Sequence, residues 1–110
     1  MNNVKKIFNF LDSVTFTTIS NSMKVKEDHL AVNFEVKGTA TTIDLVIEGV
    51  IMDSGEWVEL AAINLSNFDV ATDIEQKGAY QVTLIGLAEI RINVKNLVGG
   101  NLSVTGKVVG

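Results

Sequence analysis

The fold of this chain is decided by the stretch Ile43–Leu60, which reads I-D-L-V-I-E-G-V-I-M-D-S-G-E-W-V-E-L. From Ile43 to Ile47 apolar residues fill every second position, and a period of two is typical of a strand with one buried face. Asp53-Ser54-Gly55 then supplies turn chemistry, because Asp bonds nearby backbone amides and glycine tolerates positive φ. Trp57, the only tryptophan, begins the return strand. The stretch predicts a β-hairpin around which the other strands pack.

Strand-like alternation recurs along the rest of the chain. In Leu30–Lys37 the residues Leu30, Val32, Phe34 and Val36 are expected to point inward. Glycines at 99 and 100, followed by Asn101, form the strongest hairpin signal, because tight primed turns need positive φ. We therefore predict an all-β fold, an antiparallel β-sandwich (jelly-roll-like) of about eight short strands, each sheet having one dry and one wet face. The expected strands are 14–20, 22–26, 30–37, 43–48, 57–62, 63–70, 79–85, 89–94 and 102–108.

The first residues are ambiguous and the rest form one unit. Val4, Ile7, Phe8 and Leu11 fit one face of a helix, whereas Phe8 and Phe10 fit a strand. We expect residues 1–13 to be a short N-terminal helix or an extended arm, and residues 14–110 to be a single β-sandwich domain. A signal peptide is disfavoured, because the apolar part is short, contains a polar residue and lacks a small-residue cleavage site.

Composition excludes several classes of protein. The chain has 110 residues, no cysteine, no proline, nine glycines and a net charge of −4. Residues 27–75 hold eleven acids and one lysine, whereas residues 1–26 and 76–110 each have a net charge of +3. Without a basic stripe we expect no nucleic-acid partner. The most apolar stretch is far shorter than a membrane span, so no membrane partner is expected either.

No reaction can be assembled from the residue types. His29, the only histidine, sits beside Asp28 in a polar segment without a nucleophile-elbow motif, so we expect a solvated turn histidine. The acids fall mostly at outward strand positions, where a catalytic pair is not expected. Possible calcium ligands lack calcium-loop spacing. We expect no enzyme activity, no catalytic residues, no metal and no cofactor. The possible calcium ligands named above are Asp53, Ser54, Glu56, Asp69 and Asp73.

Two aromatic residues are the candidates for ligand contact. Trp57 and Tyr80 have flat apolar rings suited to stacking on a sugar. The alternative is structural: Trp57 anchors the core, and Tyr80 packs on the face that it shares with Val82 and Leu84 while its hydroxyl lies near the surface. We favour the structural role and keep sugar stacking as the alternative.

The order of segments resembles small structural proteins of tailed bacteriophages and prophages. The resemblance spans most of the chain and lies in the order and spacing of phrases that are individually common in β proteins. It departs at Val50-Ile51-Met52, where the family tends to have a small polar residue before the turn. The matching phrases are F-L-D-S-V-T-F-T-T at Phe10–Thr18, G-T-A-T-T at Gly38–Thr42, V-I-E-G at Val46–Gly49, D-S-G-E-W-V-E-L at Asp53–Leu60, G-A-Y-Q-V-T-L-I-G-L-A-E-I-R-I-N-V at Gly78–Val94 and G-G-N-L-S-V-T-G-K-V at Gly99–Val108.

The resemblance implies a virion structural protein in the tail, baseplate or head decoration, synthesised in the bacterial host cytoplasm. Its expected partners are itself, as a homo-oligomer, and other virion proteins. The main alternative is a carbohydrate-binding β-sandwich module that contacts a surface glycan, with Trp57 or Tyr80 stacking on the sugar. A small hydrolase is a third and weaker alternative.

Self-association would need exposed apolar surface. Val46, Val50, Val58 and Val98 fall off the main alternation, and we expect some of them to be exposed. The N-terminal segment is the other candidate, as an arm that docks on a neighbouring copy. Its predicted interface residues are Val4, Ile7, Phe8, Phe10 and Leu11.

Overall fold

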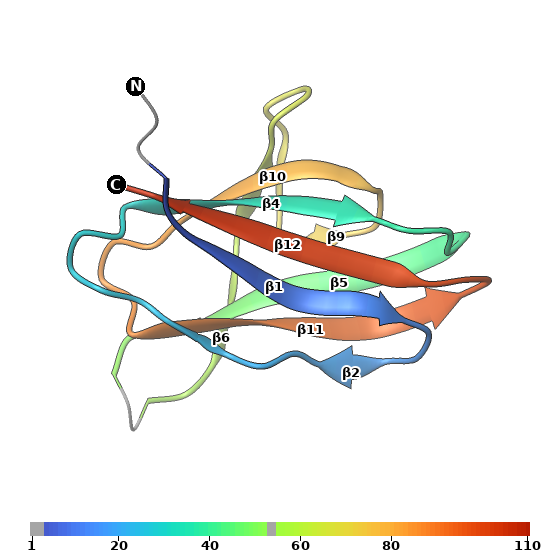
Figure 1. Ribbon diagram of the computed structural model, residues 1–110, viewed down its shortest axis with the longest axis horizontal. Helices are drawn as coiled ribbons and strands as arrows, with labels where there is room; N and C mark the ends of the chain where they lie inside the picture. The colour runs from blue at the N-terminus through green and yellow to red at the C-terminus, as the bar shows by residue number, and fades with distance from the viewer. Residues whose placement is uncertain (1–3, 53–54) are drawn as a thin grey trace.

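The computed structural model describes residues 4–52 and 55–110, with side chains described from Lys6 onward. Two antiparallel sheets pack face to face (Figure 1), as the alternation predicted. The six strands of six residues or more are β1 (Val4–Val14), β4 (Ala31–Lys37), β5 (Thr42–Val50), β10 (Gly78–Thr83), β11 (Glu89–Val98) and β12 (Leu102–Val109). The shorter ones are β2 (Thr18–Ile19), β3 (Met23–Lys24), β6 (Val58–Leu60), β7 (Ala62–Asn64), β8 (Val70–Ala71) and β9 (Asp73–Ile74).

The first sheet has the order β1-β12-β4-β10-β7-β8. The second has the order β2-β11-β5-β6, with β3 also paired to β11 and β9 also paired to β5. The short strands arise where the chain passes from one sheet to the other. For example, the predicted strand 14–20 is divided, because β1 ends at Val14 in the first sheet and β2 belongs to the second.

One side of the sandwich is closed by a hairpin that crosses both sheets. The chain leaves the second sheet after β6, enters the first as β7, turns, and returns through β8 and β9. The predicted strand 63–70 is therefore wrong as one element, since it contains two short strands and a turn. In Figure 1 this turn projects beyond β10 at the top of the view.

The core consists of the inward residues of the long strands. Val32, Phe34 and Val36 of β4 are buried, as predicted. Leu30 is an exception and is about half exposed, because β4 begins only at Ala31 and Leu30 lies in the loop at the end of the sandwich. Other buried residues are Ile43, Leu45, Ile47, Tyr80, Val82, Leu84, Ile90, Ile92, Val94, Leu102, Val104 and Val108.

In its described part, from Val4 onward, the N-terminal segment is neither a helix nor a free arm. Residues 4–14 form strand β1, which pairs antiparallel with β12 from Val4↔Val109 to Val14↔Leu102. The ring of Phe10 lies 4.6 Å from that of Phe8 and 5.4 Å from that of Phe34, centroid to centroid. The helix-or-arm prediction is wrong because pairing with β12 and the packing of Phe10 against Phe34 bind this segment into the domain.

Glycine conformation explains the hairpin between β11 and β12. Gly99 and Gly100 have φ of 79° and 149°, values that residues with a Cβ rarely adopt. The predicted glycine hairpin is confirmed. The predicted turn of the first hairpin includes Asp53 and Ser54, which lie outside the described residues.

Candidate functional site

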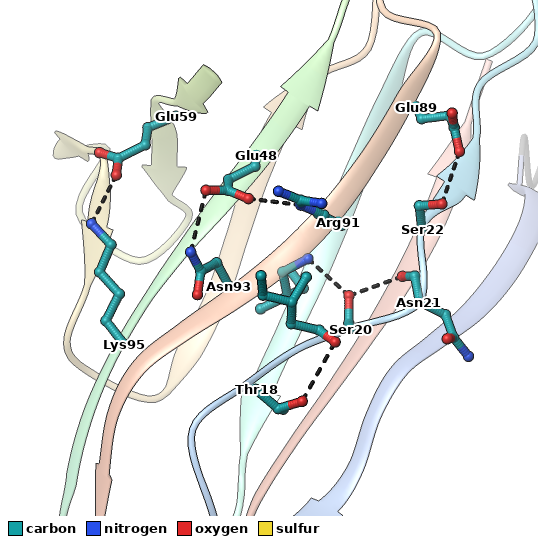
Figure 2. Close-up of polar contacts among 12 residues, drawn as sticks. Thr18, Ser20, Asn21, Ser22, Glu48, Glu59, Glu89, Arg91, Asn93 and Lys95 are labelled. Atoms are coloured by element: carbon teal, nitrogen blue, oxygen red, sulfur yellow. Dashed lines mark hydrogen bonds and ion pairs between the residues drawn. The ribbon is translucent and has the colours of Figure 1, made fainter. Parts of the chain in front are cut away.

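The outer face of the second sheet carries a row of charged and amide side chains. Alternate residues of β11 fill the core, so Arg91, Asn93 and Lys95 point outward. Arg91 Nε donates a hydrogen bond of 2.8 Å to one oxygen of Glu48 on β5, and Asn93 Nδ2 donates one of 3.3 Å to the other. Lys95 Nζ donates to Glu59 of β6 at 2.8 Å. Figure 2 shows this row running across three strands.

Trp57 belongs to this outer face and not to the core. Its ring lies beneath the Arg91 guanidinium, with the Cζ atom 4.1 Å from the ring centroid. A cation–π contact of this kind stabilises by about 0.5–2 kcal/mol, depending on desolvation. The prediction that Trp57 anchors the core is wrong, because the flat, weakly hydrated guanidinium gives the ring a partner at the surface. The indole remains half-buried.

Tyr80 lies on the other sheet and is buried, with 6% of its surface exposed. Its hydroxyl donates a hydrogen bond of 2.7 Å to the carbonyl oxygen of Gln76, and burial raises the pKa of the Tyr80 phenol. The structure therefore does not bring the two candidate stacking residues together. A sugar-stacking site would rest on Trp57.

Next to the polar row, three carboxylates surround the start of β5. Asp44 has one carboxylate oxygen, Oδ1, that is buried without a hydrogen-bond partner among the described residues. Burial raises the pKa of Asp44, and a hydrogen bond with Asp73 and the charges of Asp73 and Glu75 raise it further. The ammonium of Lys95 opposes this shift. The arrangement favours a proton on Asp44.

The five predicted interface residues are mostly structural. Phe10 and Leu11 are core residues, and Phe8 packs against that core. Ile7 points away and is 63% exposed. The side chain of Val4 lies outside the part of the chain that the structure describes. Of the described members of this set, Ile7 alone offers apolar surface to a partner.

The four valines off the main alternation divide into two pairs. Val58 and Val98 are about half exposed, as expected for contact surface. Val46 and Val50 are buried, although both lie outside the main core cluster. Both belong to β5, which pairs with β11 on one side and with β6 and β9 on the other.

His29 is buried, with 5% of its surface exposed, so the solvated-histidine prediction is wrong. Its Nδ1 accepts a hydrogen bond of 3.1 Å from the Lys26 amide, and its Nε2 lies 3.9 Å from Asp28 Oδ1. Because its Nδ1 accepts a backbone hydrogen bond from Lys26, the imidazole stabilises the loop that contains both residues. Among residues 4–52 and 55–110, no group of three or more His, Asp or Glu is placed to hold a metal ion.

Sequence reasoning missed the turn between β7 and β8. Phe68, at 75% exposure the most exposed large apolar residue described, has a φ of 63°. The signal was present, since Asn64, Ser66 and Asn67 are turn formers. Alternation of Ile63, Leu65 and the residues after them disguised the turn as a strand.

Comparison with known proteins places the chain in a family. The XepA family matches residues 5–108. The chain belongs to the XepA family. The predicted relationship to phage and prophage proteins is confirmed, without the finer assignment to virion structural proteins. No curated protein matches the chain.

Two solved structures share the fold. One is the SPBc2 prophage-derived protein YomS, with a TM-score of 0.87, 20% identity, and coverage of 96% of this chain and 92% of that one. The other is the PBSX exported protein XepA, with a TM-score of 0.89, 23% identity, and coverage of 96% of this chain but 37% of that one. This chain thus spans little over a third of the XepA chain. In the described residues no helix is long and apolar enough to cross a membrane.

Proposed function

We propose that this protein is a non-enzymatic structural component of a phage or prophage virion, in the tail, baseplate or head decoration. It acts through self-assembly and contacts with other virion proteins. The observation that carries the proposal is the grouping of exposed apolar side chains on the outside of the β-sandwich. Membership of a phage-related family supports it.

Seven of the eleven exposed large apolar residues in the described part of the chain gather at three places. Leu30 and Ile85 lie on two loops that line one pocket at an end of the sandwich. Ile51, Met52 and Val58 line a second, shallow pocket at the β5–β6 hairpin. Phe68 and Val70 lie at and beside the projecting turn. Grouped apolar surface on a soluble domain is typical of interaction sites, because burial in an interface removes it from water.

The first test is the solution mass, measured by light scattering after size exclusion at low and moderate salt. One closed oligomer at both salts supports assembly through apolar contacts, whereas an oligomer that dissociates with salt points to the uneven charges. A monomer at every concentration and salt would contradict self-assembly.

The second test is location. A virion component is synthesised in the host cytoplasm and copurifies with particles. XepA is described as an exported protein, and export of this chain would place it in the culture fluid instead. Mass spectrometry of gradient-purified particles and of particle-free medium separates these outcomes.

A second candidate is carbohydrate binding at the outer face of the second sheet. The observation that favours it is Trp57 beside Arg91 and Asn93, which combines an aromatic ring with hydrogen-bond donors for sugar hydroxyls. Glycan binding would change the fluorescence of the only tryptophan. Glycan-array and fluorescence titrations without any response would remove this candidate.

A further inference from the structure

The middle of the first sheet presents polar side chains on its outer face. Strands β12, β4 and β10 lie side by side there (Figure 1), and their register fixes which outward residues are neighbours. Alternate residues of these strands fill the core, so the residues between them face outward. Two adjacent rows cross the three strands, Lys107–Asn33–Gln81 and Thr105–Glu35–Ala79.

A pocket of about 270 Å³ lies over these two rows, and we call it the β4 pocket. Its polar lining comes from Asn33, Glu35, Thr105 and Lys107. Its apolar lining includes Ala79 and Leu65, and the Leu65 amide donates a hydrogen bond of 2.9 Å to the Ala79 carbonyl. Pockets for drug-sized ligands measure about 300–1,000 Å³, so the β4 pocket has room for one small ring.

The hydrogen-bonding groups of the β4 pocket are only partly used within the monomer. Asn33 Oδ1 accepts a hydrogen bond of 2.9 Å from Gln81 Nε2, which fixes the amide and leaves both N–H groups of Asn33 Nδ2 as donors. Within residues 6–52 and 55–110, the Thr105 hydroxyl and the Lys107 ammonium have no hydrogen-bond or ion-pair partner. By contrast, the polar row of the second sheet pairs its members with one another.

Glu35 keeps most of its capacity to accept hydrogen bonds. Its carboxylate lies 3.4 Å from Lys37 Nζ, and both side chains are about two-thirds exposed. An exposed pair of this kind contributes little, so a ligand can replace it. The β4 pocket therefore offers donors on β4 and β12, an acceptor on β4 and an apolar wall.

This combination selects a neutral ligand that both donates and accepts hydrogen bonds. Glu35 repels an anion, Lys107 repels a cation, and an apolar ligand would desolvate the polar lining without replacing its hydrogen bonds. A pyranose ring meets these requirements, because its hydroxyls accept from Asn33 or Lys107 and donate to Glu35. Its C–H groups pack against Leu65 and Ala79. A peptide is less favourable, since peptide backbones add to open sheet edges and both edges of β4 are paired.

We infer that the β4 pocket binds one ring of a neutral carbohydrate. The site is separate from Trp57, which lies on the outer face of the other sheet. Each copy holds the whole pocket, so binding does not depend on the proposed self-assembly.

The test is an NMR titration of the ¹⁵N-labelled protein with the methyl glycosides of glucose, galactose and mannose. At least one glycoside should shift the amide signals of Asn33, Glu35 and Thr105 and leave the Trp57 indole signal unchanged. Inorganic phosphate and N-acetyl-trialanine amide, as anion and peptide probes, should not shift them. The inference is wrong if no glycoside shifts these amides, if the glycosides shift only signals around Trp57, or if only phosphate or the peptide acts on the pocket.

Variants locate the binding. Asn33→Asp keeps the acceptor for Gln81 but removes the two donors, and it should raise the dissociation constant for the glycoside at least about tenfold, as should Lys107→Ala. Ala79→Trp, at an exposed position, should fill the pocket and abolish binding. The controls Lys24→Ala, at an exposed lysine on β3, and Trp57→Ala should bind as the natural chain does.

Light scattering separates this inference from the proposed function. The pocket variants should have the same solution mass as the natural chain, whatever that mass is. If Ala79→Trp binds the glycoside as tightly as the natural chain, the inference is wrong while the proposed function stands. If the pocket variants change the solution mass and the natural chain binds no glycoside, this face is an interface between copies and the inference is also wrong.

Discussion

Replacing Gly106 by alanine adds one methyl group to the core and so tests how tightly the first sheet is packed. It lies on β12, between Phe8 of β1 and Phe34 of β4 in the strand register. A Cβ at this position would lie 2.9 Å from Phe10 Cε2 and 2.9 Å from Val32 Cγ2. Ordinary contacts of this kind are longer than about 3.4 Å, so Gly106→Ala forces both side chains to shift.

The expected loss combines two opposing effects. Adding a methyl group to a packed core costs about 1–3 kcal/mol. Replacing glycine by alanine lowers the entropy of the unfolded chain and returns about 0.4–1 kcal/mol, because the backbone of Gly106 is not left-handed. We expect Gly106→Ala to lower the free energy of unfolding by about 1–2 kcal/mol, which is roughly 4–8 °C in Tm for a domain of this size.

Urea denaturation and calorimetry measure this loss, and a double-mutant cycle locates it. Val32→Ala removes the methyl group that the new Cβ meets, so Gly106→Ala should cost about 1 kcal/mol less in the Val32→Ala background than in the natural chain. A Gly106→Ala variant as stable as the natural chain would refute the reasoning. So would a loss that is identical in both backgrounds, because the clash with Val32 would then not be its cause.

Three further substitutions test other parts of the structure. The pKa of Asp44 in the folded protein is raised above its ordinary 3.8, so the folded state binds a proton on Asp44 more tightly than the unfolded state does. The protonated carboxyl therefore stabilises the fold at low pH, and this contribution is lost as the pH rises from about 3.8 through the raised pKa. Asp44→Asn lacks this titration, so its urea midpoint should increase relative to that of the natural chain as the pH is raised from 3.5 to 7.5. If the urea midpoints of the two proteins change with pH in parallel, Asp44 is not the titrating group. Phe10→Ala should cost about 3–5 kcal/mol in urea denaturation, whereas the exposed Asn9→Ala costs less than about 0.5; equal small losses would mean that β1 is not part of the core. His29→Ala should cost about 1–3 kcal/mol, because the Lys26 amide loses its acceptor and a buried ring is removed, and thermal melting that matches the exposed control Lys24→Ala would contradict this role.

The strands with one clear alternating face were predictable because their pattern depends only on local geometry. In β4, in β10 and in β11 as far as Val94, every second residue is apolar, and these residues fill the core. Gly99 and Gly100 marked their hairpin for a similar reason, since positive φ is a property of single residues. Val46 lies on the strand face opposite to Leu45 and Ile47, and only the structure shows that it is buried as well.

The candidate surfaces were predicted less well, because exposure depends on what lies across from a side chain. No pattern in the sequence indicates that Arg91 covers the ring of Trp57, since the two residues are brought together only by the pairing of β11, β5 and β6. His29 looked solvated because its neighbours in sequence are charged. It is buried because two loops from distant parts of the chain close over it.

The sequence by itself determined an all-β sandwich, its main core residues and the glycine hairpin that joins its last two strands. Only the tertiary structure decided that residues 4–14 are a sheet strand, and that the chain crosses between sheets at β6–β7 and β8–β9. Only the structure left Phe68 exposed at a strained tip. The physical reason is that periodicity records which faces of a strand differ in polarity, whereas sheet order and exposure follow from contacts between residues far apart in the chain.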